Sequence, residues 1–376
     1  MSNNSNFSFI HASDIHLGSN QYRNDYRADD FIRALQEILD LGLIHQVDFI
    51  LLGGDVFTSL EVLPEKLTKI VEILKDFENS ANGSIPIIAI EGNHDIRKYS
   101  RGVMVNHGQS WLKFLANLGL IILLDANIED PPEQLFANYD FTIKKGGKIQ
   151  VKSAMIYGTR YLGQKPEEYL PKIRSAIKVD DGLFHILIQH YGIQGQMENV
   201  PGIDFQKVQI LKDRVDYLAL GHFHLQFTLD DWIYNPGSSE AACSVDFSYK
   251  RGIFLVKVLS KNKYIKRIYP IRLNNRSYIW KTIYFNSKFK DKEKMNSFIV
   301  QKLKNSLKNL RNDLKSSDPK VPILFLLLKG IKPAKSCKID EKKLSKTICE
   351  TLPLVGIRIY QKFKNPLITI DTFFKK

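Results

Sequence analysis

Five short apolar runs, each followed at once by residues that can bind a metal ion, constrain the fold of this chain more than any other feature. The apolar residues in each run are continuous rather than alternating, which is typical of strands buried on both faces. Open α/β sheets bind ligands beyond the carboxyl ends of their strands. The runs and the residues that follow them are Phe7–His11 with Asp14 and His16, Phe49–Leu52 with Asp55, Ile85–Ile90 with Asn93, His94 and Asp95, His185–Ile188 with His190, and Tyr217–Leu220 with His222 and His224. We therefore predict an α/β fold in which these strand ends lie at one edge.

The residue types at these strand ends indicate a metal site. Carboxylate, amide and neutral imidazole groups together suit Mn, Fe or Zn rather than a site built on thiolates. Residues two apart in an extended segment point to the same side. Asp14 with His16, and His222 with His224, can therefore reach one metal cluster.

The segments between the strand ends predict helices and turns. Apolar residues recur at helical spacing over 25–41, and Pro64 opens a second predicted helix. The residues over 97–109 are expected to form a loop. The Lys144–Lys148 cluster, which contains two glycines, predicts a β-hairpin turn.

The composition of the chain changes near residue 260. From there basic residues interleave with Tyr and Ile, and acidic residues are absent between Asp246 and Asp291. The segment beyond predicts the order β-α-β-α-β. We expect a catalytic domain over 1–265, a linker over 266–276 and a small α+β domain over 277–376.

The positive charge of the chain is concentrated in its final quarter. The formal net charge is +14. Residues 271–376 hold 25 of the 54 Lys and Arg and 8 of the 40 Asp and Glu, so this segment carries +17 and the rest of the chain −3. Such a concentration is typical of a surface that binds a polyanion such as a nucleic acid. A lysine-rich solvated surface, as in thermophile proteins, is the alternative.

Targeting signals and cysteine usage indicate the compartment. No apolar run approaches the ~20 residues of a membrane helix, and M-S-N-N-S-N at the start lacks the regions of a signal peptide. The three cysteines, Cys243, Cys337 and Cys349, are odd in number and have no metal-site spacing. This usage fits a reducing interior. We expect a cytoplasmic, nucleoid-associated protein.

The order of the motifs over residues 7–258 resembles that of the calcineurin-like metallophosphoesterases. Within that superfamily the chain is similar to the double-strand-break repair nucleases of the meiotic recombination eleven and SbcD type. The motifs that carry the resemblance are S-D-I-H-L-G (Ser13–Gly18), G-G-D-V-F (Gly53–Phe57), E-G-N-H-D (Glu91–Asp95), Q-H-Y-G (Gln189–Gly192), G-H-F-H (Gly221–His224) and N-P-G-S-S-E (Asn235–Glu240).

The resemblance implies a metallophosphoesterase β-sandwich flanked by helices in four layers, α/β/β/α, with a small capping domain that binds DNA. It implies two divalent metal ions, with Mn²⁺ expected. One ion would be held by Asp14, His16 and His224, and the other by Asn93, His190 and His222. Asp55 would bridge both ions, and His94 would be the general acid. The alternatives are a supporting role for His94 and a turn role for Asn93. Asp95 is expected to orient the site through local hydrogen bonds rather than to bind a metal.

The function implied by the resemblance is that of a Mn-dependent DNA nuclease in double-strand-break repair. Such an enzyme acts as a 3′-to-5′ exonuclease on double-stranded DNA and as an endonuclease on single strands. It works with an SMC-like coiled-coil ATPase and as a homodimer. Two departures from the family pattern are Thr58, where many relatives have His, and an end at Lys376 soon after the cap. A small-molecule phosphodiesterase and a non-catalytic DNA-binding scaffold are the alternative functions.

Overall fold

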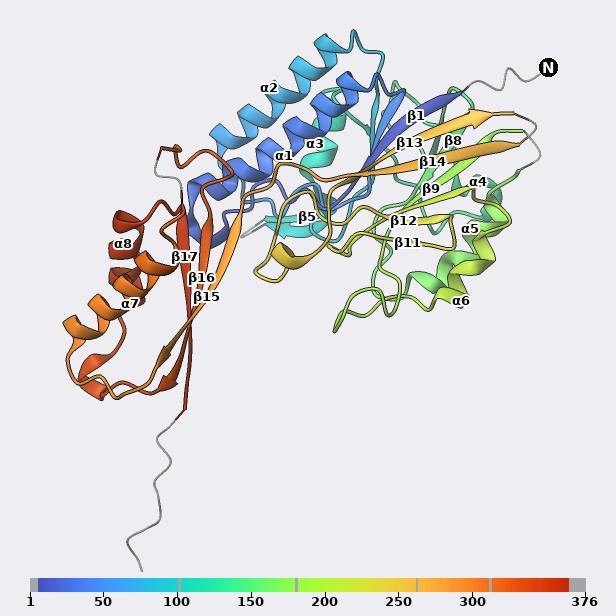
Figure 1. Cartoon of the computed structure of the whole chain (residues 1–376). Helices are drawn as coiled ribbons and strands as arrows, with labels where there is room; N and C mark the ends of the chain where they lie inside the picture. The colour runs from blue at the N-terminus through green and yellow to red at the C-terminus, as the bar shows by residue number, and fades with distance from the viewer. Residues whose placement is uncertain (1–5, 101–102, 180–181, 262, 311–312, 365–376) are drawn as a thin grey trace, which may run out of the picture. The chain divides into compact units, whose positions relative to one another are not determined.

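The computed structural model describes residues 6–100, 103–179, 182–261, 263–310 and 313–364. The chain forms two compact units. The first comprises Met1–Gln21 and Arg27–Asn274, and the second comprises Tyr22–Tyr26 and Asn275–Lys376. The described part of the first unit contains two six-stranded sheets and a two-stranded sheet, and that of the second contains a three-stranded sheet (Figure 1).

The first large sheet has the strand order β14-β13-β1-β2-β3-β6. β1, β2, β3 and β6 run parallel to one another, while β13 and β14 are antiparallel to their neighbours. The carboxyl ends of the four parallel strands therefore meet at one edge. The bounds are β1 (Phe7–Ala12), β2 (Phe49–Leu52), β3 (Ile87–Ala89), β6 (Ile122–Leu123), β13 (Ile253–Ser260) and β14 (Tyr264–Ile271).

The second large sheet has the order β11-β12-β10-β9-β8-β7. Its central strands β8, β9, β10 and β12 are parallel, and β7 and β11 pair antiparallel at the two edges. The bounds are β7 (Lys148–Val151), β8 (Ala154–Gly158), β9 (Phe184–His190), β10 (Tyr217–Gly221), β11 (Phe227–Leu229) and β12 (Ile233–Asn235).

The two sheets pack face to face, which explains why the strand sequences are continuously apolar. Phe9 of β1 belongs to the buried cluster between the sheets, with Ile186 and Ala219 of the second sheet. The next residue, Ile10, belongs instead to the cluster between the first sheet and its helices. Successive side chains of a strand point to opposite faces. A strand buried on both faces therefore needs an apolar residue at every position.

Helices cover both outer faces of the sandwich, and this confirms the predicted four-layer α/β/β/α arrangement. α1 (Asp25–Ile44), α2 (Pro64–Ser80) and α3 (Trp111–Asn117) pack on the first sheet. α4 (Pro132–Leu135), α5 (Leu170–Ala176) and α6 (Phe205–Val208) pack on the second. α1 and α2 lie side by side (Figure 1), with Lys66 Nζ 2.8 Å from Asp29 Oδ1.

The second unit contains β15 (Tyr278–Phe285), α7 (Lys292–Ser306), β16 (Ile323–Ile331), α8 (Glu341–Thr351) and β17 (Gly356–Lys364), in the predicted order. Its strands form a parallel sheet with β16 in the centre. Apolar residues of both helices form its core with β16. The short segment Tyr22–Tyr26 belongs to this unit, and Asn24 Nδ2 donates a hydrogen bond to the Val355 carbonyl oxygen at 2.8 Å.

Three predicted features differ from the structure. Most of the predicted linker over 266–276 is strand β14, which pairs with β13 over its whole length, and the first unit extends to Asn274. The predicted loop over 97–109 contains the antiparallel pair β4 (Arg97–Ser100) and β5 (Val103–Gln109). The chain reverses just before the predicted hairpin turn at Lys144–Lys148, with an antiparallel bridge between Asp140 and Lys145, but the predicted flanking strands do not pair across it. Instead β7 begins at Lys148 and pairs with β8 through a turn at Lys152. In β14 exposed and half-buried residues alternate, as is common in an edge strand. Because such a strand has no continuous apolar run, its sequence is interpreted as a linker between domains.

Candidate metal centre

The ends of β1, β2, β9 and β10, and the loop after β3, bring the seven predicted ligands together. Asp14, His16 and His224 have ligand atoms within 4.8 Å of one another. Asp55, His190 and His222 form a second group by the same distance. These residues come from strands of both sheets, so the fold places the site where the two sheets meet at their carboxyl edges.

The first group consists of two imidazole rings and one carboxylate. The Nε2 atoms of His16 and His224 face each other at 3.1 Å. His224 Nε2 is 3.9 Å from Asp14 Oδ1. The backbone N–H of His222 donates to Asp14 Oδ2 at 3.0 Å, which fixes the carboxylate.

The second group is completed by the amide of Asn93. Its Oδ1 atom is 3.1 Å from His190 Nε2 and 3.0 Å from His222 Nδ1. Asp55 Oδ2 is 3.2 Å from His190 Nε2. Asp55 also has ligand atoms within 4.8 Å of those of His16 and His94. Asp55 thus lies between the two groups, at the position that a bridging carboxylate requires.

The backbone at the site is held in an uncommon conformation. Asp14, His16, Asp55 and His222 have φ angles of 51°, 55°, 49° and 88°. Non-glycine residues rarely adopt positive φ, and such strain clusters at functional sites. Gly54 also has positive φ, and a Cβ atom there would lie 2.6 Å from His190 Nδ1. The glycine in the G-G-D motif is therefore needed for the close approach of β2 to His190.

Hydrogen bonds orient two of the imidazole rings. His190 Nδ1 lies 2.8 Å from the Gly53 carbonyl oxygen, which can only accept. His224 Nδ1 lies 2.7 Å from Oδ2 of Asp246, a fully buried residue. In both rings Nδ1 therefore donates a hydrogen bond, and Nε2 is the nitrogen that faces the centre. Sequence reasoning does not find Asp246, because nothing in the segment after N-P-G-S-S-E marks one carboxylate as an imidazole partner.

Asp95 makes the local hydrogen bonds that are predicted for it. Its buried carboxylate accepts hydrogen bonds from the backbone N–H groups of Val56, Phe57 and Gly92 at 3.2, 2.8 and 3.0 Å. These bonds join the turn after β2 to the turn after β3. Asp95 therefore shapes the loops that carry Asp55 and Asn93.

His94 lies at the rim of the site with an exposed ring. Its backbone N–H donates to Asp55 Oδ1 at 2.7 Å, and its Nδ1 is 3.1 Å from the carbonyl oxygen of Thr58. The ring centre is 5.1 Å from that of His16. Exposure suits a group that meets substrate, while the nearness to His16 and Asp55 leaves a ligand role open. Thr58 thus meets the His94 ring through its backbone carbonyl group.

Burial and charge set the protonation of the centre. Burial, together with the nearby His224, lowers the pKa of His16 to about 3. Burial and His190 lower the pKa of His222 to about 4. Burial opposes charge on His190, but Asp55 outweighs it and raises the pKa of His190 to about 9. His16 and His222 are thus neutral near pH 7, as metal ligands must be. Asp55 and His190 share a proton, and a bound cation would take the place of that proton.

The residues fit a pair of divalent cations. Two ring nitrogens facing each other at 3.1 Å form at most one hydrogen bond, whereas a cation can accept both lone pairs. In the described part of the chain, the buried Nδ1 atom of His16 has no hydrogen-bond partner. Imidazole, carboxylate and amide donors together suit Mn, Fe or Zn.

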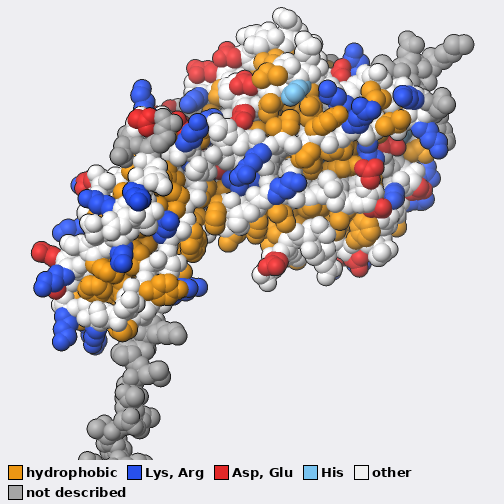
Figure 2. All heavy atoms as spheres, viewed as in Figure 1, with side chains coloured by type: hydrophobic (Ala, Val, Ile, Leu, Met, Phe, Trp, Pro, Cys, Tyr) orange, Lys and Arg blue, Asp and Glu red, His pale blue; other side chains and the backbone are white. Residues whose placement is uncertain are grey.

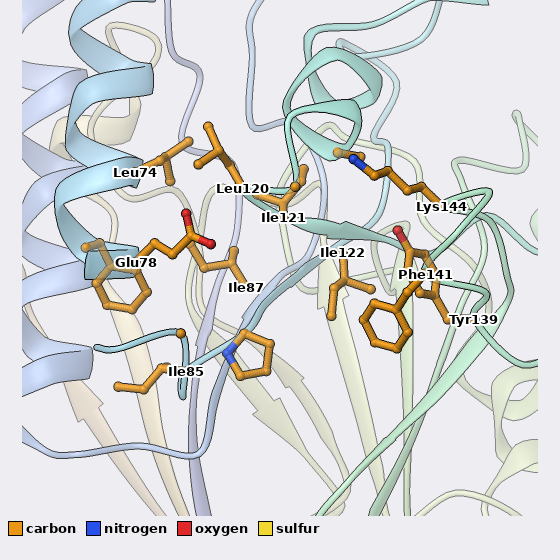
Figure 3. A pocket seen from close by; sticks show the side chains of 15 residues that line it. Leu74, Glu78, Ile85, Ile87, Leu120, Ile121, Ile122, Tyr139, Phe141 and Lys144 are labelled. Carbon is orange, nitrogen blue, oxygen red and sulfur yellow. The ribbon is translucent and has the colours of Figure 1, made fainter. Parts of the chain in front are cut away.

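Other histidines and cavities of the first unit lie apart from this centre. His11 is buried in β1, with its ring nitrogens 3.0 Å from the Tyr217 hydroxyl and the Leu220 carbonyl oxygen. His185 in β9 lies 3.1 Å from the Tyr157 hydroxyl. A cavity of about 220 Å³ lies among α2, β3, β6 and the segment of Tyr139 and Phe141 (Figure 3). Its walls are mostly apolar, with Glu78 and Lys144 as charged members, so Glu78 is the one carboxylate among its lining residues.

A sandwich of two sheets with two adjoining groups of imidazole and carboxylate side chains at its edge is an arrangement that can hold a pair of metal ions. The family model of the calcineurin-like phosphoesterases matches residues 7–226. The chain belongs to this family, whose members have a dinuclear metal site. Among the described residues, none of the helices has the length and apolar character needed to span a lipid bilayer.

Three curated proteins named DNA double-strand break repair protein Mre11 are similar to this chain. The one from Archaeoglobus fulgidus is 37% identical over 112 residues, which is 30% of this chain and 24% of the relative. The one from Sulfurisphaera tokodaii is 28% identical over 228 residues, 59% of this chain and 50% of the relative. The one from Saccharolobus solfataricus is 24% identical over 357 residues, 94% of this chain and 81% of the relative. The chain thus spans half or less of the first two relatives and about four fifths of the third.

Proposed function

We propose that the protein is a two-metal DNA nuclease that processes DNA ends in double-strand-break repair. The observation that carries the proposal is the position of Asp55 between the Asp14–His16–His224 group and the Asn93–His190–His222 group. Two divalent cations held by these groups, with Mn²⁺ expected, would bind the phosphodiester oxygens and supply a hydroxide nucleophile near neutral pH. The names of the three relatives support DNA repair as the setting.

The residues of the chain have separate proposed roles in this reaction. Asp14, His16 and His224 would hold one cation, Asn93, His190 and His222 would hold the other, and Asp55 would be the ligand shared by both. His94 is the proposed general acid, because its ring is exposed at the rim beside Asp55 and His16. It would donate a proton to the leaving 3′ oxygen or 5′ oxygen of the DNA strand.

The second unit is the proposed DNA cap. Lys302, Lys304 and Lys308 are exposed on and after α7, and Lys342 and Lys346 are exposed on α8. Figure 2 shows Lys and Arg side chains distributed over this unit. Exposed cations bind the phosphate backbone without sequence preference. We further propose 3′-to-5′ exonuclease and single-strand endonuclease activities, an SMC-like ATPase partner, a homodimer and an intracellular location at the nucleoid.

A small-molecule phosphodiesterase is the second candidate, favoured by a cavity of about 410 Å³ beside the site. Tyr161, Gly192, Ile203 and His222 are among the residues that line it. The ring centre of Tyr161 is 6.2 Å from that of His222. A cavity of this size suits a nucleotide-sized ligand. The basic second unit favours DNA instead, since a small substrate needs no extended cationic surface.

The test of the proposed function compares three substrates in Mn²⁺ buffer. These are labelled double-stranded DNA, labelled single-stranded DNA and bis-p-nitrophenyl phosphate. The proposed nuclease function predicts cleavage of DNA. Hydrolysis of bis-p-nitrophenyl phosphate alone would support the small-molecule phosphodiesterase. Asp55→Asn should abolish every activity that depends on the centre, because an amide is a poor bridging ligand. Activity that survives in Asp55→Asn would contradict the proposed site.

The His94 assignment is tested by the leaving group. His94→Ala should slow DNA cleavage by roughly 10²–10⁴-fold, which is the usual contribution of a general acid. It should slow hydrolysis of the p-nitrophenyl ester much less, because p-nitrophenolate leaves without a proton. Bound Mn²⁺ should be unchanged. An equal decrease in rate on both substrates, or a loss of bound Mn²⁺, would instead make His94 a ligand or a supporting residue.

A further inference from the structure

A second cluster of ligand-type side chains lies on the other side of the His224 ring. The Nε2 atom of His224 faces His16 and Asp14, whereas its Nδ1 atom faces Asp246. Cys243 Sγ is 2.9 Å from Asp246 Oδ1. The donor atoms of Cys243, Asp246 and His224 all lie within 4.8 Å of one another. Cys243 is exposed and Asp246 is fully buried, so the cluster reaches solvent through the thiol.

The donor set of this cluster differs in kind from that of the main centre. It combines a thiol, a carboxylate and an imidazole, which is a zinc-type ligand set. Thiolate ligands favour Zn²⁺ over Mn²⁺, and for most sites the affinity for Zn²⁺ is also intrinsically higher. One thiolate and one carboxylate balance the charge of one divalent cation. The described ligands of the main centre include no thiol, so a bond to sulfur distinguishes a cation at this cluster from a cation at the main centre.

We propose that Cys243, Asp246 and the Nδ1 atom of His224 form an inhibitory site for a thiophilic divalent cation such as Zn²⁺. On binding, the Cys243 thiol loses its proton to solvent and the thiolate bonds to the cation. The proton on His224 Nδ1 moves to Nε2, and the vacated Nδ1 lone pair binds the cation. The Nε2 atom then carries a proton and has no lone pair for the main centre.

The inhibitory effect rests on the proposed nuclease function, whereas cation binding does not. A neutral imidazole ring has one lone pair, so while the ring keeps its proton a cation at Nδ1 and a cation at Nε2 of His224 exclude each other. The Asp14–His16–His224 group would keep Asp14 and His16 as ligands but lose His224. Zn²⁺ at this position would therefore inhibit a Mn²⁺-dependent reaction without occupying the main centre.

The experiment measures bound zinc in the full chain. Wild type, Cys243→Ser and Cys349→Ser are incubated with ZnCl₂ and desalted, and zinc per chain is counted by mass spectrometry. Wild type and Cys349→Ser should each retain one zinc more than Cys243→Ser. A serine hydroxyl can still donate to Asp246, so Cys243→Ser should keep its fold and its Mn²⁺ binding. Equal zinc content in Cys243→Ser and wild type would overturn the proposal.

Two further measurements separate binding from inhibition. Co²⁺ added in place of Zn²⁺ should give a sulfur-to-cobalt charge-transfer absorption in wild type that Cys243→Ser lacks. In excess Mn²⁺, half-inhibition of hydrolysis by Zn²⁺ should need at least about tenfold more zinc in Cys243→Ser, because a ligand is removed. Equal inhibition of both proteins would overturn the inhibitory role. If neither protein hydrolyses any substrate, the proposed function fails, and the zinc count still decides the site.

Discussion

The carboxylate of Asp246 determines which nitrogen of His224 faces the metal centre. It accepts the Nδ1 proton at 2.7 Å and is itself held by the backbone N–H groups of Ala242 and Cys243, each at 2.9 Å. A carboxylate of this kind fixes the tautomer of a ligand histidine and raises its basicity. The main centre thus depends on a residue that is not one of its seven predicted ligands.

Removal of this carboxylate should weaken the metal centre. We expect Asp246→Ala to lower Mn²⁺ affinity by roughly 10–100-fold, as for other carboxylates behind ligand histidines. Calorimetric titration with Mn²⁺ measures the effect. Asp213→Ala is the matched control, because Asp213 forms an exposed ion pair with Arg174. Unchanged affinity in Asp246→Ala would show that His224 needs no orienting partner.

For single residues, the sequence predicts the positions that belong to recognisable motifs. Asp14, His16, Asp55, Asn93, His190, His222 and His224 follow strands, and the structure brings all of them together. Their roles as ligands stay predictions. The partner of His224 is not predictable, because Asp246 reaches the site through a turn rather than a strand end. The positive φ of Asp14 and Asp55 is equally hidden, since neither residue type demands it.

Strand β1 carries a buried titratable group that makes stability depend on pH. Burial lowers the pKa of His11 to about 3, despite its hydrogen bond to the Leu220 carbonyl. In the unfolded chain the pKa of a histidine is about 6.5. Between these values the unfolded state binds a proton that the folded state does not. Stability from this group is therefore full above about pH 6.5 and falls as the pH decreases toward 3.

The prediction for β1 is a change in the slope of stability with pH. Below pH 6 the free energy of unfolding of wild type should fall by about 1.4 kcal/mol per pH unit on account of His11. His11→Gln should lose that part of the slope, and His45→Gln, at an exposed position, should keep it. Urea denaturation at several pH values measures the slopes. Parallel curves for wild type and His11→Gln would contradict the buried neutral state.

The strands are predictable where burial on both faces imposes a continuous apolar run, as in β2 and β9. Strand β14 is not predictable, because as an edge strand it has few buried residues. Its alternation of exposed and half-buried residues is also hard to recognise where the sequence becomes rich in basic residues. The β7–β8 turn is also hidden in the sequence. Two glycines at 146–147 give a stronger turn signal than Lys152 and Ser153, which form the turn of the β7–β8 hairpin.

The charge of the whole molecule divides between its two units, and this division should appear in the salt dependence of DNA binding. Replacing Lys302, Lys304 and Lys308 by Gln should weaken binding to all sequences alike. The slope of log affinity against log salt concentration should shrink by up to about 0.9 for each DNA phosphate that the variant no longer neutralises. Fluorescence anisotropy with labelled duplex DNA at several salt concentrations measures the slope.

A matched triple variant in the first unit provides the control. Lys165, Lys207 and Lys212 are exposed but lie 3.4, 3.3 and 2.5 Å from carboxylates of Glu168, Glu167 and Asp230. Their charges are partly neutralised within the protein, so replacing them by Gln should change the slope much less. Equal slopes for the two triple variants would remove the second unit from DNA binding.

The chain enters the second unit twice, and this has a mechanical consequence. Tyr22–Tyr26 belongs to that unit, although the residues on either side of it, Gln21 and Arg27, belong to the first. The second unit is thus tethered to the first by three covalent crossings instead of one. The first of these crossings, between Gln21 and Tyr22, lies only a few residues after His16, so the backbone connects the second unit closely to the predicted metal ligands.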